Sequence, residues 1–89
     1  MSREELDKLA KEVVDVIYTV HRLMGPGLLE SVYEMCALKE FELRNIKAIG
    51  QFNVPLIYKG FELTKDFKID ILVENEIVLE FKSFSLLKT

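Results

Sequence analysis

The sequence predicts a single α+β domain in which an N-terminal helical hairpin packs on a three-stranded, mainly antiparallel sheet. Apolar residues recur at helical spacing up to about residue 45, and β-branched and aromatic residues dominate after it. A chain of 89 residues with 49% apolar and 30% charged side chains suits one small domain over residues 1–89. Its four glycines and two prolines are too few for a collagen-like or disordered chain. No apolar run approaches the roughly 18–20 residues that span a bilayer.

The first helix is expected to begin with a capping box. Glu5 follows Ser2 by three residues, so the serine hydroxyl and the glutamate carboxylate can each satisfy a backbone N–H of the first turn. The segment Gly25-Pro26-Gly27 ends the helix. Between them, one apolar face is formed by Leu6, Leu9, Ala10, Val13, Ile17, Val20 and Met24.

A second helix is predicted over about residues 28–45 and forms a hairpin with the first. The single cysteine, Cys36, cannot form a disulfide within the chain, and its helical spacing favours a core position over a reactive thiol. The apolar positions of this helix are Leu29, Val32, Tyr33, Cys36, Ala37, Phe41 and Leu43.

Three strands are predicted in the second half, over about residues 51–58, 61–73 and 77–84. Tyr58-Lys59-Gly60-Phe61 indicates a tight turn between the first two strands. Apolar residues alternate with polar ones in the second strand from residue 67 to residue 73, which is typical of a strand with one buried face.

The loop between the last two predicted strands sets their register. A three-residue loop, Glu74-Asn75-Glu76, pairs Val73 with Ile77 and Ile71 with Leu79, so that the apolar sets share one face. On the other face, the same register places Asp70 opposite Glu80 and Lys68 opposite Lys82. Two carboxylates about 5 Å apart at their β-carbons repel each other unless a cation or a lysine lies between them.

Asp70, Glu80 and Lys82 have the chemistry of a metal-dependent phosphodiesterase site. Carboxylate oxygens suit Mg²⁺ or Mn²⁺, and a lysine can position the attacking water or stabilise the developing negative charge. The alternative is a solvated cross-strand group in which Lys82 neutralises its acidic neighbours.

The formal net charge of −3 argues against a strong nonspecific polyanion binder, but the charge is unevenly distributed. Residues 44–68 carry five basic and two acidic side chains, whereas residues 1–43 carry five basic and nine acidic ones. The middle segment is therefore the candidate surface for a polyanion, and ordinary solvated lysines are the alternative. Its basic residues are Arg44, Lys47, Lys59, Lys65 and Lys68.

Several ordered blocks resemble the GxxExxY protein family, a branch of the PD-(D/E)XK nuclease superfamily. Residues 21–34, HRLMGPGLLESVYE, contain Gly27, Glu30 and Tyr33 at the positions that name the family. Pro55, the Tyr58-Lys59-Gly60 block, the strand at residues 68–73 and the Glu-x-Lys of residues 80–82 follow in order. The resemblance covers about residues 10–83.

The resemblance implies a restriction-endonuclease-like core that hydrolyses DNA or RNA phosphodiesters with Mg²⁺ or Mn²⁺. Asp70, Glu80 and the helix-borne Glu30 would be catalytic metal ligands, and Lys82 the catalytic lysine. His21 would orient the metal ligands or transfer a proton, and Tyr33 would hydrogen-bond the site or a substrate. The alternatives are a partly buried, hydrogen-bonded histidine and a tyrosine with a structural place at a helix–sheet contact. The nucleic-acid-facing residues would be Lys59, Lys65 and Lys68.

Members of the family usually continue with a further helix and strand after Glu-x-Lys, and seven residues after Lys82 are too few for both. We therefore expect a C-terminally incomplete core, truncated after the third strand. Either the chain is a truncated gene product, or a second copy or another protein covers the open edge. An inactive interaction module that pairs through this edge is the alternative function. A chain that does not fold alone is a third. Without a signal-like N-terminus or a membrane segment, we expect a cytoplasmic location.

Overall fold

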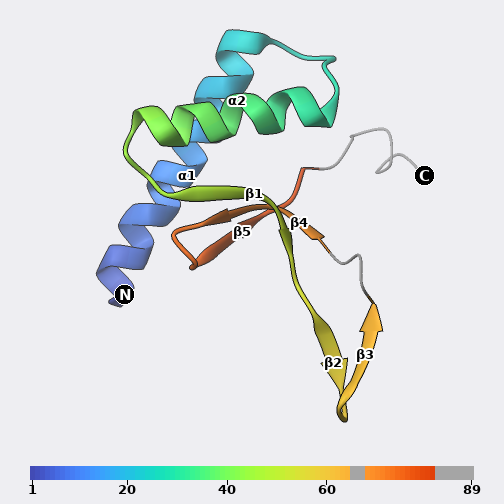
Figure 1. Cartoon of the computed structure of the whole chain (residues 1–89). Helices are drawn as coiled ribbons and strands as arrows, with labels where there is room; N and C mark the ends of the chain where they lie inside the picture. Colours follow the sequence, from blue (N-terminus) through green and yellow to red (C-terminus); the bar gives the residue numbers. More distant parts are fainter. Residues whose placement is uncertain (65–67, 82–89) are drawn as a thin grey trace, which may run out of the picture.

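The structure is a computed structural model that describes residues 1–64 and 68–81. Two helices are followed by a small antiparallel sheet, which confirms the predicted α+β class (Figure 1). The elements are α1 (Arg3–Met24), α2 (Glu30–Leu43), β1 (Ala48–Asn53), β2 (Leu56–Tyr58), β3 (Phe61–Thr64), β4 (Lys68–Val73) and β5 (Ile77–Leu79).

The main sheet has the strand order β1-β4-β5, and both pairings are antiparallel. Strands β2 and β3 form a separate two-stranded sheet. The prediction of one strand over residues 51–58 is therefore wrong, because the chain leaves the main sheet between Asn53 and Leu56. Pro55 lies in this break, where a residue without an N–H interrupts a strand ladder most easily.

The second and third predicted strands also differ in length from the observed ones. The segment predicted as 61–73 contains β3 and β4, and its residues 65–67 lie outside the described residues. Strand β5 is shorter than the predicted 77–84, of which residues 82–84 also lie outside.

Helix α1 begins and ends as predicted. The Glu5 N–H donates to Ser2 Oγ at 3.1 Å, and the Ser2 N–H donates to Glu5 Oε1 at 2.9 Å. The Gly25 N–H donates to the carbonyl of His21 at 2.9 Å. These bonds satisfy backbone groups that a helix end would otherwise leave without partners.

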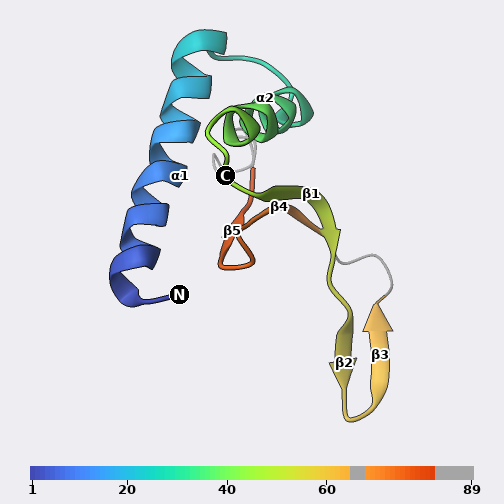
Figure 2. The ribbon, with the colours of Figure 1, turned by 60° about the vertical axis from the view of Figure 1, so that its left-hand side comes forward.

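The buried face of α1 is narrower than predicted. Val13, Val16 and Val20 are buried, whereas Ala10 and Met24 are exposed. Val16 is fully buried although it was not among the predicted face residues. Both ends of α1 extend past the layer formed by α2 and the sheet, so only its middle turns are covered (Figure 2).

Helix α2 is shorter than predicted and buries Tyr33, Ala37 and Phe41, which are four residues apart. Leu29 and Leu43, two of the apolar positions named for this helix, flank the stripe and are exposed. Cys36 is half-buried and packs against the core with its thiol unpaired, in agreement with the predicted core role.

The hydrophobic core lies between the helices and β4. Ile71 and Val73 meet the buried valines of α1 and the buried stripe of α2. The predicted pairs of Val73 with Ile77 and of Ile71 with Leu79 are confirmed, and β4 alternates buried and less buried residues as expected. Gly50 permits the close approach of α2 to β1, because a β-carbon there would lie 2.8 Å from Leu38 Cδ1.

Candidate active site

Asp70 lies on β4, on the face of the sheet opposite the helices. Its neighbours Ile69 and Ile71 are buried, Ile71 in the core beneath the helices, and the half-buried Asp70 points the other way. Asp70 Oδ2 accepts a hydrogen bond from the Phe81 N–H at 2.6 Å. A backbone donor therefore fixes the orientation of this carboxylate.

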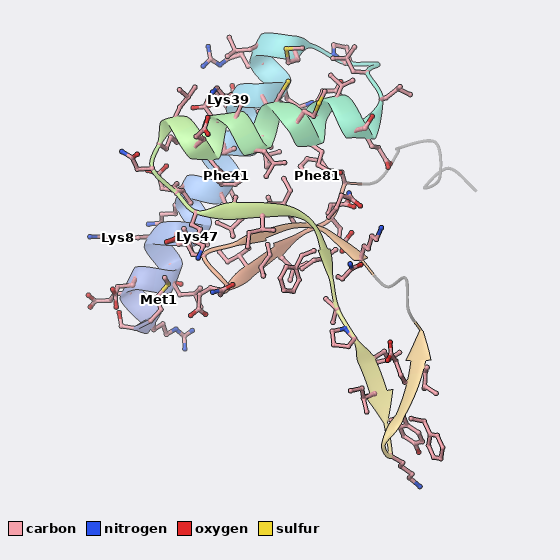
Figure 3. All side chains as sticks on the ribbon, in the orientation of Figure 1. Met1, Lys8, Lys39, Phe41, Lys47 and Phe81 are labelled. Carbon is pink, nitrogen blue, oxygen red and sulfur yellow. The ribbon has the colours of Figure 1, made fainter. Side chains whose placement is uncertain are left out.

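Glu80 adjoins Asp70 across the two strands. Leu79 is paired with Ile71, and Phe81 is hydrogen-bonded to Asp70, so Glu80 lies between two residues that contact β4. The pairing assigned to β5 ends at Leu79, one position before the predicted opposition of Asp70 and Glu80. The side chain of Phe81 packs against the core beneath α2 (Figure 3). The chain at Glu80 thus runs beside Asp70 at the end of β5.

The predicted partners of this acidic pair are placed only in part. Lys68 is exposed on β4, two residues before Asp70 and on the same face of the strand. Lys82 lies outside the described residues, so the predicted opposition of Lys68 and Lys82 is not tested.

Glu30 is the first residue of α2 and is exposed. The N-cap residue Leu29 offers no side-chain hydrogen bond, so an acidic residue in this first turn is favoured by the helix dipole. Among residues 1–64 and 68–81, no three His, Cys, Asp or Glu side chains are placed to hold a metal ion together. Glu30 therefore does not join Asp70 and Glu80 in one group of carboxylates.

Tyr33 closes the loop that precedes Glu30. Its hydroxyl donates to the Gly25 carbonyl at 2.5 Å and accepts from the Leu28 N–H at 3.2 Å. The ring of His21 stacks on the Tyr33 ring, with 4.8 Å between centroids. His21 is exposed, so the alternative of a half-buried histidine is wrong. Both side chains organise the α1–α2 loop through contacts that sequence spacing did not reveal.

Arg44 balances its charge against acidic groups on both helices. Its guanidinium lies within 3.0 Å of Glu12, Asp15 and Glu40 carboxylate oxygens, and it donates to Thr19 Oγ1 at 3.3 Å. The hydrogen bond with Glu40, and those with Glu12 and Asp15, raise the pKa of Arg44. The prediction of Arg44 as part of a polyanion-facing surface is therefore wrong.

The other predicted basic residues lie in separate places. Lys59 occupies the turn of the β2–β3 hairpin, with its Nζ 5.4 Å from the centroid of the Tyr58 ring. Lys47, at the start of β1, donates its backbone N–H to Glu74 Oε1 at 3.1 Å. Lys65 lies outside the described residues.

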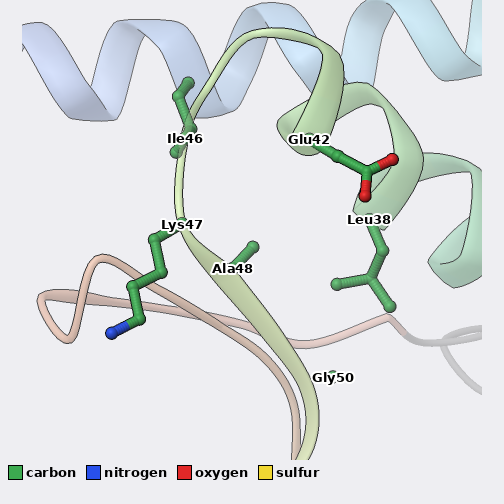
Figure 4. A pocket seen from close by; sticks show the side chains of 6 residues that line it. All are labelled: Leu38, Glu42, Ile46, Lys47, Ala48 and Gly50. Carbon is green, nitrogen blue, oxygen red and sulfur yellow. The ribbon is translucent and has the colours of Figure 1, made fainter.

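An open pocket of about 410 Å³ lies between the end of α2 and β1 (Figure 4). It contains none of the predicted metal-site residues, although Lys47 of the predicted polyanion-facing segment lines it, and apolar side chains line much of the rest. Its lining residues are Leu38, Glu42, Ile46, Lys47, Ala48 and Gly50.

None of the helices in the described part of the chain is long and apolar enough to cross a membrane.

A helical hairpin on an antiparallel sheet, with Asp70 on one strand and Glu80 after the next, is an arrangement of the nuclease-like class. The family model described as the PD-(D/E)XK nuclease superfamily matches residues 7–89, and the chain belongs to this superfamily. The match does not resolve the GxxExxY branch, which stays a prediction. Neither the curated proteins nor the solved structures contain a match.

Proposed function

We propose that this protein hydrolyses nucleic-acid phosphodiester bonds with a divalent metal ion held by Asp70 and Glu80. The observation that carries the proposal is the adjacency of these two acidic residues in a member of the PD-(D/E)XK nuclease superfamily. Nucleases of this superfamily generally use divalent metals, and two carboxylates are the donor set that Mg²⁺ or Mn²⁺ prefers. We propose DNA or RNA as the substrate.

Each residue has a distinct part in this proposal. Asp70 and Glu80 bind the metal, and the Phe81 N–H holds the Asp70 carboxylate in place. A bound divalent ion would polarise a phosphoryl oxygen and lower the pKa of a bound water. Lys82 would position the attacking water or stabilise the negative charge that develops on the phosphate. Glu30, in the first turn of α2, lies apart from this acidic pair in the described part of the chain and has no part in the proposed metal site.

The test is cleavage of labelled single-stranded and duplex DNA and RNA by the full chain with Mg²⁺ or Mn²⁺. We expect metal-dependent products that are lost in Lys82→Ala and in Asp70→Asn. Lys8→Ala, an exposed lysine of α1, is the matched control and keeps full activity. Cleavage by Lys82→Ala at the wild-type rate would refute the role of Lys82, and cleavage in EDTA would refute the metal requirement.

A second candidate function is an inactive interaction module that pairs through the edge of the sheet. Within residues 1–64 and 68–81, β5 pairs with β4 on one side, and its Val78 is exposed. Such an edge can add a strand from a second copy or another protein. This function predicts a stable complex that does not depend on metal. A strictly monomeric sedimentation profile contradicts pairing with a second copy.

For either function, we propose a cytoplasmic location.

A further inference from the structure

The β2–β3 hairpin projects away from the body of the molecule (Figures 1 and 2). The hairpin is small, with seven residues in its two strands and two residues in its turn, and its apolar side chains are exposed. Tyr58 and Phe61 are 58% and 70% exposed, and Ile57 is 63% exposed. An isolated two-stranded hairpin is only marginally stable in water, so exposed rings at its tip indicate a surface that contacts something else.

The turn of this hairpin places two aromatic residues on one face. Tyr58 and Phe61 are direct partners across the two-residue turn, and directly opposed residues share one face of a hairpin. Lys59 and Gly60 both have positive φ angles, 50° and 84°, as a type I′ turn requires. The short turn therefore fixes which face both aromatic residues occupy.

The same face carries a positive charge and no opposing carboxylate from the described strand pair. The Lys59 ammonium lies over the Tyr58 ring. Glu62 is paired with Ile57, one position further along the hairpin, and so points to the opposite face. In sequence, residues 54–68 contain three basic and two acidic side chains within a chain of net charge −3.

Lysine is also an unfavourable residue for this turn position. A type I′ turn favours Asn, Asp or Gly there, because other residues pay a conformational cost at positive φ. Lys59 therefore supplies a charge at a position where backbone geometry favours a different residue. The tip therefore combines a lysine ammonium, held on a strained backbone, with two exposed aromatic rings. Proteins that bind single-stranded nucleic acids use the same two features, a cation for the phosphate and ring faces for the bases.

We propose that the tip of the β2–β3 hairpin binds unpaired nucleic-acid bases, with Tyr58 and Phe61 stacking on bases and Lys59 contacting a phosphate. The choice of nucleic acid as the partner rests on the proposed function. A second copy of this chain is the other occupant that the exposed rings could take. The charge at the centre of the tip disfavours it, because charged residues are depleted from the cores of such interfaces.

The test is binding of fluorescein-labelled 12-nucleotide single-stranded DNA and RNA to the full chain in EDTA, followed by fluorescence anisotropy. EDTA keeps binding separate from any metal-dependent cleavage. We expect Tyr58→Ala and Phe61→Ala each to weaken binding at least about fivefold, the low end for loss of one base-stacking contact. Ile57→Ala is the matched control, since it removes a similarly exposed apolar side chain from the opposite face and leaves binding unchanged.

Lys59→Asn separates the charge from the fold of the turn. Asparagine tolerates positive φ, so this variant relaxes the turn while it removes the cation. We expect weaker binding. We also expect the slope of log affinity against log salt concentration to become shallower by about the contribution of one phosphate contact. Unchanged affinity in Lys59→Asn, Tyr58→Ala and Phe61→Ala overturns the proposal, as does an equal loss in Ile57→Ala.

Two further outcomes distinguish this inference from the function on which it rests. Cleavage that persists in the tip variants with unchanged affinity contradicts the tip contact and leaves the nuclease proposal standing. Tip-dependent binding by a chain that cleaves nothing supports the contact and contradicts the nuclease proposal. A dimer in sedimentation that dissociates in Tyr58→Ala or Phe61→Ala, without nucleic-acid binding, assigns the tip to a second copy and overturns the inference.

Discussion

The carboxylate of Asp70 accepts a 2.6 Å hydrogen bond from the backbone N–H of Phe81. This bond joins β4 to the residues that follow β5. Glu80 lies between Leu79, which pairs with β4, and Phe81, which makes the bond. The side chain of Phe81 packs against the core at the same point. The position of the acidic pair is therefore tied to the packing of the sheet, and a change at Asp70 reports on both stability and site geometry.

The first prediction concerns this bond. Asp70→Ala removes the acceptor and leaves the Phe81 N–H without it, so we expect the free energy of unfolding to fall by about 1–2 kcal/mol. Asp70→Asn keeps an amide oxygen as acceptor, and we expect a smaller loss. Urea unfolding of the three proteins measures both changes. Equal stability of Asp70→Ala and the wild type would show that the bond contributes nothing.

The sequence predicted the fold well where residue spacing is local. The Ser2–Glu5 capping box and the β4–β5 register depend on neighbours within a few residues, and both are confirmed. The division of the predicted 51–58 strand was missed, because β-branched and aromatic residues continue on both sides of Pro55 although the chain changes sheets there. A pattern of side chains does not specify which strand is the partner.

The second prediction concerns the α1–α2 loop. Tyr33→Phe keeps the ring and its stack with His21 but removes the hydroxyl that links Gly25 and Leu28. We expect a loss of about 1–2 kcal/mol in unfolding free energy, because two backbone groups lose their partner. Hydrogen exchange at the Leu28 amide measures the local effect, and we expect faster exchange there than in the wild type. Unchanged exchange at Leu28 contradicts the account of the loop.

The third prediction concerns Arg44, which links the end of α2 to α1. Arg44→Lys keeps the charge but cannot reach several carboxylates with a planar fork of donors. We expect both Arg44→Lys and Arg44→Ala to be less stable than the wild type, with a loss of about 1–2 kcal/mol for alanine. Added salt should narrow the difference, since two of the partner carboxylates are more than half exposed. Thermal unfolding at low and high salt checks this, and full stability of Arg44→Ala at low salt contradicts it.

The fourth prediction concerns pH. Hydrogen bonds from the Ser2 backbone and side chain lower the pKa of Glu5 below its ordinary value of 4.5. The capping box therefore contributes its full stabilisation above pH 4.5, and the contribution is lost as the pH falls through the lowered pKa. The Ser2 amide proton, followed by NMR, should titrate with a midpoint below 4.5. Glu5→Gln keeps the capping geometry and should remove this titration, and a midpoint at or above 4.5 in the wild type contradicts the prediction.

The candidate site was predictable only in part. The adjacency of Asp70 and Glu80 follows from loop length and strand alternation, which the sequence contains. The partners of Arg44 could not be predicted in this way. Glu12 lies 32 residues away on another helix, and a count of charges does not show which acidic residue pairs with which basic one. The one local signal for this cluster was Glu40, which precedes Arg44 by four residues. The exposure of the Tyr58 and Phe61 rings likewise depends on how the hairpin leaves the sheet.

The most direct test of the central claim, that Asp70 and Glu80 form a metal site, is thermal unfolding of the 89-residue chain with and without Mn²⁺. A ligand that binds only the folded state adds about 2.7 kcal/mol at a hundredfold excess over its dissociation constant. We predict a cooperative transition that moves to higher temperature with Mn²⁺, and no such movement in Asp70→Asn. A cooperative transition that Mn²⁺ leaves unmoved, or one that moves equally in Asp70→Asn, would contradict the account.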